Sequence, residues 1–286
     1  MIKILVTGGA GFIGSNLCEE LTLDPSNQIT VLDNYSTGFK VNHVEGVQYI
    51  DGETYDIDHL VNFSPDIVYH LGEYSRVEQS FEDIELVCKS NMIGTFKVLQ
   101  FCRKHKCKIV YAGSSTKFGD NGNGRNQSPY GWSKASNVDL VKNFGEWYGL
   151  EYAITYFYNV YGKREISTGK YATLIAIFSK QYWQGKPLTI VSPGTQVRNF
   201  THVKDIINGV ILVGKQGIGD GYGIGTSESF SVLEIAKMFG SKIEMLPERP
   251  GNRMFGELHV EKTKSLNWKP IHSVTDYIKK VINISS

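Results

Sequence analysis

The sequence predicts an α/β fold in which a doubly wound parallel sheet is followed by a smaller C-terminal α/β substrate-binding domain. In the first half, short β-branched runs alternate with helical patterns, which is the rhythm of βαβ units. The runs contain few polar residues, as is typical of strands covered on both faces. Strands are expected at 2–7, 29–33, 67–71, 108–112 and 152–157, and helices near 12–23, 82–105 and 131–148.

The alternation weakens after about residue 160, where segments shorten and glycine becomes common. We therefore expect a first domain over 1–160, with a return segment near 195–213, and a second region over 161–286. This second region should cap the carboxyl ends of the strands, where open α/β sheets bind their ligands.

The bulk composition excludes several classes of protein. The 286 residues carry 30 Lys and Arg against 29 Asp and Glu, a net charge of +1 that argues against a nucleic-acid surface as the main function. We expect no membrane span and no secretory signal, and hence a cytoplasmic protein. The cysteines form no complete ligand set, so no metal site is expected; they are Cys18, Cys88, Cys102 and Cys107.

A glycine-rich turn follows the first expected strand and opens the first expected helix. Gly8, Gly11 and Gly14 are spaced so that the chain can turn tightly and approach a pyrophosphate. The amino end of the helix then offers free N–H groups to phosphate. The turn therefore predicts a dinucleotide site in a Rossmann-type domain.

Asp33 ends the second expected strand, at the spacing where a carboxylate accepts hydrogen bonds from the adenosine ribose. An acidic side chain at this position repels a 2′-phosphate, and no arginine follows it directly. The predicted cofactor is therefore NAD rather than NADP.

Tyr130 and Lys134 lie one turn apart on an expected helix and face the same way. A phenol, with a reference pKa of about 10, is a weak base at neutral pH, but a neighbouring ammonium stabilises the phenolate. Ser114 follows an expected strand and is placed to bind the same substrate hydroxyl. The three residues predict removal of a hydroxyl proton as hydride passes to NAD. The pair alone is also typical of an amphipathic surface helix, and only its context favours catalysis.

With these motifs, the chain resembles the extended short-chain dehydrogenases/reductases, within the family of NAD-dependent nucleotide-sugar epimerases and dehydratases. The similarity extends nearly from end to end. Further matching stretches are 31–38, 68–71, Asn91 with Gly94 and Thr95, 158–162, 198–205 and 248–251. The resemblance implies a nucleotide-diphosphate sugar as substrate, a role in carbohydrate biosynthesis, and a homodimer. The helices at 82–105 and 131–148 would build the dimer interface, although Leu86, Ile93, Phe96 and Leu99 are equally typical of a core.

The resemblance also implies particular site residues. The cofactor site would add the residues Phe12, Ile13, Asn34, Leu71 and Asn91 to the glycines, Asp33, Tyr130 and Lys134. The substrate would be bound by Ser114, Ser115, Asn159, Arg198 and Arg249. Guanidinium groups suit this task because their geometry matches phosphate oxygens.

The residues after Ser114 bear on the type of reaction. The 4,6-dehydratases of the family carry Asp-Glu where this chain has Ser115 and Thr116, and neither of these can serve as a carboxyl acid. A 4-epimerase needs only Ser114, Tyr130, Lys134, NAD and room for a 4-keto sugar to rotate. We therefore expect a nucleotide-sugar 4-epimerase. A dehydrogenase or reductase, a 2-epimerase and, less so, a 4,6-dehydratase remain alternatives, and outside the enzymes a non-catalytic dinucleotide sensor.

Several departures from the family pattern keep those alternatives open. Where the family usually has two small residues, this chain has Gly72 and Glu73, followed by Arg76. Glu73 is interpreted either as an additional acid or base or as a hydrogen-bonding loop residue. Lys117, Phe118 and Tyr156 also replace family residues and would be consistent with an unusual sugar.

Overall fold

The computed structural model describes residues 1–118, 123–248 and 256–284. Seven strands form one parallel sheet in the order β11-β6-β5-β4-β1-β2-β3. Their bounds are β1 (Ile2–Thr7), β2 (Asn27–Asp33), β3 (Gln48–Asp51), β4 (Ile67–His70), β5 (Lys108–Ser114), β6 (Tyr152–Phe157) and β11 (Gly219–Ile224). The strand order reverses between β1 and β4, so the loops after these two strands flank the crevice where such sheets bind ligands. The predicted fold class is confirmed.

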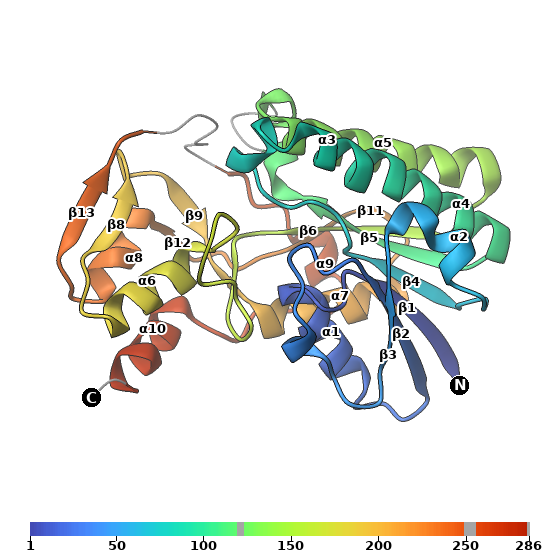
Figure 1. Cartoon of the computed structure of the whole chain (residues 1–286), viewed down its shortest axis with the longest axis horizontal. Coiled ribbons are helices and arrows are strands. Elements are labelled where there is room, and N and C mark those ends of the chain that lie inside the picture. Colours follow the sequence, from blue (N-terminus) through green and yellow to red (C-terminus); the bar gives the residue numbers. More distant parts are fainter. Residues whose placement is uncertain (119–122, 249–255, 285–286) are drawn as a thin grey trace.

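Helices cover both faces of this sheet (Figure 1). One face carries α2 (Ile57–Leu60), α3 (Ile84–Val87), α4 (Thr95–His105) and α5 (Pro129–Tyr148), and the other carries α1 (Phe12–Leu21) and α7 (Val203–Gln216). Alternate side chains of β1 enter the two cores: Leu5 packs with α4 and α5, whereas Ile4 and Val6 pack with α1 and α7. This two-sided burial explains the apolar strands of the sequence.

The helical stretch expected over 82–105 is not an α-helix throughout. A 3-10 turn, η3 (Glu78–Phe81), precedes α3, and a π-helical segment, η4 (Cys88–Gly94), joins α3 to α4. Wider turns of this kind are frequent at functional sites, and this one contains the buried Asn91. The stretch is therefore helical from residue 84 to 105, as expected, and its central turns are wider than those of an α-helix.

The helix expected over 131–148 begins two residues earlier, at Pro129. Ser128 caps it by accepting a hydrogen bond from the Gly131 N–H at 3.0 Å. A capping serine followed by proline at the first helical position is a favourable helix start. The capped end places Tyr130 in the first turn of α5.

A third core lies in the C-terminal part and contains Tyr161, Phe178 and Ile235. Three two-stranded sheets pair β7 with β10, β8 with β13 and β9 with β12. The bounds here are β7 (Val160–Tyr161), α6 (Leu174–Trp183), β8 (Leu188–Val191), β9 (Val197–Asn199), β10 (Thr201–His202), β12 (Ser229–Ser231), α8 (Val232–Met238), β13 (Ile243–Leu246), α9 (Glu261–Lys264) and α10 (Val274–Asn283). Short 3-10 turns complete the chain at η1 (Lys40–Asn42), η2 (Thr54–Asp56), η5 (Ser115–Phe118) and η6 (Asn123–Asn126).

The chain returns to the large sheet through α7 and β11, so the returning segment extends to Ile224, beyond the expected range of 195–213. The strands β3 and β11 were not expected from the sequence. We keep the division near residue 160 as a proposal, with α7 and β11 assigned to the first domain.

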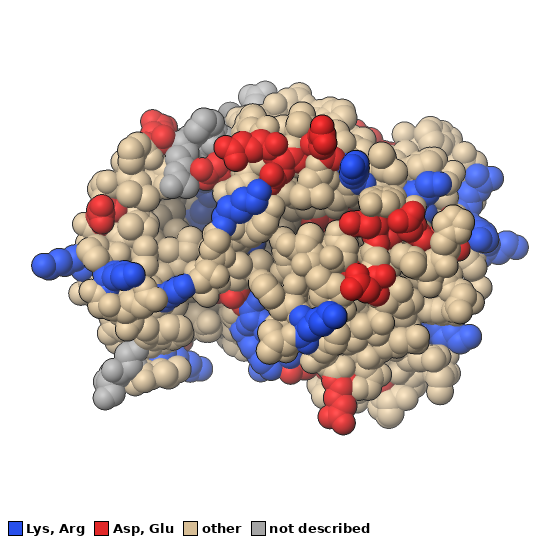
Figure 2. Space-filling model, in the orientation of Figure 1, with Lys and Arg blue, Asp and Glu red and all other residues tan. Residues whose placement is uncertain are grey.

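The surface carries both signs of charge. On the face drawn in Figure 2, acidic and basic side chains are interspersed, in keeping with the net charge of +1. None of the helices in the described residues combines the length and apolar character that a bilayer crossing requires.

Candidate active site

The glycine turn after β1 brings backbone segments into very close contact. Gly8 has a φ of +75°, which favours glycine, and a Cβ on Gly14 would lie 2.1 Å from the Gly8 carbonyl oxygen. The Gly8 Cα also faces the loop after β4, because an added Cβ would lie 2.8 Å from the Gly72 nitrogen. Gly11 caps α1 without a side-chain hydrogen bond, so the helix start offers backbone donors. The turn therefore fits a diphosphate group.

Asp33 lies at the carboxyl end of β2 and is buried. Its two carboxylate oxygens accept hydrogen bonds from the N–H groups of Ala10 and Tyr35, both at 2.8 Å. Burial raises the pKa of Asp33, and the two N–H groups oppose this shift. Asn34 donates to Glu53 at 2.9 Å, so a second acidic side chain lies at the same edge. This edge offers several acceptors to a ribose.

A cavity of about 620 Å³ runs from the glycine turn to the C-terminal region. Phe12, Ile13, Asn34 and Leu71 line it, as the resemblance implied for a cofactor site. Asn91 lies elsewhere: its side chain is fully buried and hydrogen-bonded to the backbone N–H and carbonyl of Tyr74 and to the Ser133 hydroxyl. In this structure the Asn91 side chain supports the backbone of Tyr74, which itself lines the cavity.

Ser114, Tyr130 and Lys134 converge on this cavity from the end of β5 and the first turns of α5. All three are buried, with exposed fractions of 9%, 9% and 6%. The Ser114 hydroxyl accepts hydrogen bonds from the hydroxyl and the N–H of Thr116, at 2.8 and 3.3 Å. The three predicted catalytic side chains therefore share one wall of the cavity.

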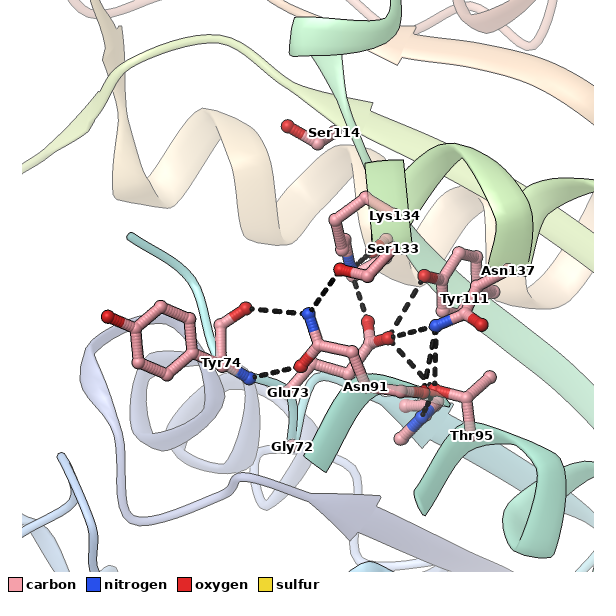
Figure 3. Close-up of polar contacts among 12 residues, drawn as sticks. Gly72, Glu73, Tyr74, Asn91, Thr95, Tyr111, Ser114, Ser133, Lys134 and Asn137 are labelled. Atoms are coloured by element: carbon pink, nitrogen blue, oxygen red, sulfur yellow. Dashed lines mark hydrogen bonds and ion pairs between the residues drawn. The ribbon is translucent and has the colours of Figure 1, made fainter. Parts of the chain in front are cut away.

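Glu73, in the loop after β4, holds the centre of a buried polar network (Figure 3). Its Oε1 atom accepts hydrogen bonds from Thr95 and Asn137, both at 2.8 Å, and from the Tyr111 hydroxyl at 3.1 Å. Its Oε2 atom forms an ion pair with the Lys134 ammonium. A carboxylate buried to this extent needs such partners. The structure thus favours the hydrogen-bonding interpretation of Glu73.

A directional chain of hydrogen bonds extends this network to β1. The Gly72 N–H donates to Thr7 at 3.0 Å, and His70 lies between Thr7 at 2.7 Å and Thr95 at 2.9 Å. Because Thr95 donates to the Glu73 carboxylate, its oxygen accepts from His70 Nε2, and His70 Nδ1 accepts from Thr7. Burial lowers the pKa of His70 to about 4, which agrees with this neutral form.

Arg76 brings a guanidinium group to the cavity wall, close to Tyr130. Its Nε donates to the Tyr171 carbonyl at 2.9 Å, and its Nη1 donates to the Ser75 carbonyl at 3.0 Å. Burial lowers the pKa of Arg76, and a negative charge on Tyr130 would oppose that shift. Arg76 therefore places positive charge near Tyr130.

The structure describes all of the residues expected to bind substrate except Arg249. Ser115, Asn159 and Arg198 all line the cavity, with Asn159 at the left-handed φ of +32°. Arg198 donates to the Val197 carbonyl at 2.8 Å. Arg249 falls outside the described residues.

Three departures from the family pattern, the buried Tyr156 and the half-buried Lys117 and Phe118, pack together. Tyr156 is 1% exposed, donates to Asp220 at 2.6 Å and contacts the Phe118 ring at 4.8 Å. Lys117 lies 3.8 Å from the same Asp220 carboxylate. These substitutions form a mutually compensating cluster, and nothing in their contacts identifies an unusual sugar.

The sequence predicted no site role for Thr95, Tyr111, Asn137 or the half-buried cavity residue Glu165. Asn137 follows Lys134 by three residues and so lies on the same face of α5, which is a recognisable signal. Burial raises the pKa of Glu165 to about 7, while Thr173 donates to its carboxylate at 2.6 Å. Within the described ranges, no group of three or more His, Cys, Asp or Glu side chains could hold a metal.

Comparison with known proteins agrees with this site. A model of the NAD-dependent epimerase/dehydratase family matches residues 4–225. A Methanocaldococcus jannaschii protein, provisionally named a UDP-glucose 4-epimerase, is 33% identical over 301 residues, covering 98% of this chain and 97% of its own. UDP-glucuronic acid decarboxylase 1 of Danio rerio is 27% identical over 308 residues, covering 99% of this chain and 72% of its own.

The same relationship holds in three dimensions. The crystal structure of the Thermus thermophilus UDP-glucose 4-epimerase in complex with NAD matches with a TM-score of 0.89 at 27% identity, covering 99% of both chains. With a family model that spans more than half of the sequence, the chain belongs to the NAD-dependent epimerase/dehydratase family, and its cofactor is NAD.

Proposed function

We propose that the protein is a nucleotide-sugar 4-epimerase that acts through a transient 4-keto sugar. The observation that carries this proposal is the meeting of Ser114, Tyr130 and Lys134 in the cavity that also contains the glycine turn. The UDP-glucose 4-epimerases among the relatives support it.

In this proposal Tyr130 removes the proton of the sugar 4-hydroxyl and later returns it, with Ser114 hydrogen-bonded to the same oxygen. Lys134 stabilises the phenolate and binds the nicotinamide ribose. NAD, when bound, would supply the hydride acceptor and donor that the sugar carbon needs. Rotation of the keto sugar before its carbon is reduced again would invert the centre.

The nucleotide and diphosphate are assigned to Asn159, Arg198 and Arg249, with Ser115 near the sugar. Ser115 and Thr116 supply no carboxyl group at the positions where the family's dehydratases carry Asp-Glu. The buried carboxylate of Glu73 is occupied by its four donors. These features favour epimerisation over loss of water.

A second candidate is decarboxylation of a nucleotide-linked uronic acid. It is favoured by the half-buried guanidinium of Arg76 in the cavity wall, whose charge would complement a sugar carboxylate, and by the decarboxylase among the relatives. The two reactions share oxidation at C4 and differ in whether carbon dioxide leaves.

The test incubates the purified protein with UDP-, GDP-, CDP- and dTDP-hexoses and UDP-glucuronic acid, without added NAD, in deuterated water. Unchanged mass, one inverted centre and no carbon-bound deuterium support 4-epimerisation. Deuterium at the inverted carbon indicates 2-epimerisation or another route through proton loss beside a carbonyl. Loss of carbon dioxide or of water indicates a decarboxylase or a dehydratase.

Retention of cofactor separates the remaining alternatives. An epimerase regenerates its NAD and keeps it through purification, whereas a dehydrogenase or reductase must exchange it and would need added NAD or NADH. Binding of NAD without turnover of any sugar in the panel would favour the dinucleotide sensor.

We also propose a cytoplasmic homodimer built on α3, η4, α4 and α5. Ile84, Ile93, Phe96 and Trp147 are exposed by 51%, 49%, 38% and 59%, whereas Leu99 belongs to the core. Phe96 and Trp147 both contact Phe144, so they form one apolar surface. Light scattering should report a dimer that Phe96→Asp dissociates and that a distant change, Val41→Asp, leaves intact.

A further inference from the structure

Glu73 places a negative charge where the family resemblance leads one to expect a small, neutral residue. Its side chain is 2% exposed and that of Lys134 is 7% exposed, so the pair is shielded from water. Electrostatic interactions between shielded groups are stronger than at the surface. The charge of Glu73 therefore acts directly on the environment of the proposed catalytic side chains.

The hydrogen bonds of Glu73 argue against an acid or base role. A carboxylate offers about four acceptor positions, and here Thr95, Asn137 and Tyr111 contact Oε1 while Lys134 contacts Oε2. An ionised carboxylate in this arrangement has no proton to donate. Its acceptor positions are taken by these four donors, which leaves none for a substrate group.

The contacts of Lys134 show what Glu73 can do instead. The ammonium donates to Glu73 and to the Ala112 carbonyl, and lies 4.6 Å from the centre of the Tyr111 ring. Two of the three N–H groups of the lysine are thus used inside the protein. The third is left for the cavity, which Lys134 lines together with Tyr130.

We propose that Glu73 is a positioning residue for Lys134, which fixes the ammonium and balances its charge so that Tyr130 loses its proton at a higher pH than beside an uncompensated lysine. The catalytic consequence rests on the proposed function, in which Tyr130 is the base. The electrostatic effect itself does not need a sugar substrate.

Among the described residues, the titratable groups that surround Glu73 and Lys134 supply no other negative charge next to the Lys134 ammonium, so Glu73 is the group that balances it. Burial lowers the pKa of His70 to about 4 and raises that of Tyr111, so both are neutral near pH 7. Burial also raises the pKa of Tyr74, which packs with Tyr130. Arg76, in the loop after β4, lies near Tyr130 and adds positive charge, and Glu165 lies near enough to Arg76 to interact with it electrostatically.

The test titrates Tyr130 in the NAD-loaded protein through the near-ultraviolet absorbance of its phenolate, taken as the difference from the matching Tyr130→Phe protein. In Glu73→Gln, Lys134 is left uncompensated, and the midpoint should fall by about one pH unit. Glu73→Ala, which restores a small residue, should shift the midpoint the same way and carries the test if the glutamine variant does not fold. Glu73→Asp keeps the charge and should titrate like the unaltered protein.

Glu20→Gln removes a surface carboxylate on α1 and serves as the matched control. An unchanged midpoint in Glu73→Gln and Glu73→Ala, or an equal shift in Glu20→Gln, overturns the proposal. With an active substrate, the acid side of the pH–rate profile should move by the same amount. Because the titration contains no sugar, failure of every sugar in the panel counts against the proposed function alone.

Discussion

Gly14 lies so close to Gly8 that a Cβ on Gly14 would be 2.1 Å from the Gly8 carbonyl oxygen and 2.8 Å from its carbonyl carbon. Both neighbours are backbone atoms, so the contact cannot be relieved by a side-chain rotation. We expect Gly14→Ala to destabilise the protein by about 1–3 kcal/mol and to abolish retention of NAD.

Denaturant unfolding and the absorbance of released cofactor measure these two effects. Gly11→Ala provides a graded comparison, because its nearest new contact would be 3.3 Å away. If Gly14→Ala and Gly11→Ala lost equal amounts of stability and of bound NAD, the steric explanation would be contradicted.

The Asp33 carboxylate should determine affinity for NAD and preference over NADP. Asp33→Asn keeps the size of the side chain but removes its charge and one of the two acceptors that hold Ala10 and Tyr35. We expect NAD to bind at least about tenfold more weakly, or ~1.4 kcal/mol, with a smaller preference against NADP. Isothermal titration calorimetry of both cofactors is the measurement.

Asp51→Asn is the control for this change, since Asp51 is exposed and pairs with Asp33 in the register of β2 and β3. If the two variants bind NAD equally well, a role for Asp33 in the ribose site is excluded.

Tyr130 should be essential for turnover and dispensable for folding. Replacing it with phenylalanine removes only the hydroxyl, and loss of a general base typically lowers the rate by about 10²–10⁴-fold. We expect a fall in kcat of this size with NAD still bound, and a smaller fall for Ser114→Ala. Tyr148→Phe, at the exposed end of the same helix, should be unaffected. More than a tenth of normal activity in Tyr130→Phe would require another base.

His70 should make stability fall as the solution becomes acidic. Burial lowers its folded pKa from 6.5 to about 4, so between these values the unfolded chain binds a proton that the folded chain does not. Stability is therefore retained above about pH 6.5 and is lost towards pH 4, at up to ~1.4 kcal/mol for each pH unit. His202, whose pKa is also lowered to about 4, contributes with the same sign.

Urea unfolding at several pH values between about 7 and 5 measures this slope. The slope should be shallower in His70→Gln and unchanged in His59→Gln, which alters an exposed histidine. Equal slopes for the unaltered protein and His70→Gln would show that His70 is not the titrating group.

Local signals in the sequence were sufficient for much of the fold and part of the site. The strands at 2–7 and 152–157 have the predicted bounds because continuous apolar runs demand burial on both faces. The glycine spacing, Asp33 and the Tyr130–Lys134 pair are local patterns whose geometry follows from one turn, one strand end and one helix. These parts could be predicted without knowing what packs against them.

Other features depend on contacts between distant segments. β3 and β11 are short and weakly patterned, and they become strands because β2 and β6 offer them partners. The turns at 88–94 are π-helical rather than α-helical, and Asn91 within them is hydrogen-bonded to Tyr74 and Ser133.

By itself, then, the sequence determined a dinucleotide turn, a strand-end aspartate and a tyrosine–lysine pair, because each needs only local backbone geometry. Only the tertiary structure decided the role of Glu73, which lies 61 residues from Lys134 along the chain. No spacing rule links such positions. The direction of a buried carboxylate is set by whichever donors the fold brings to it, here from β5, α4 and α5.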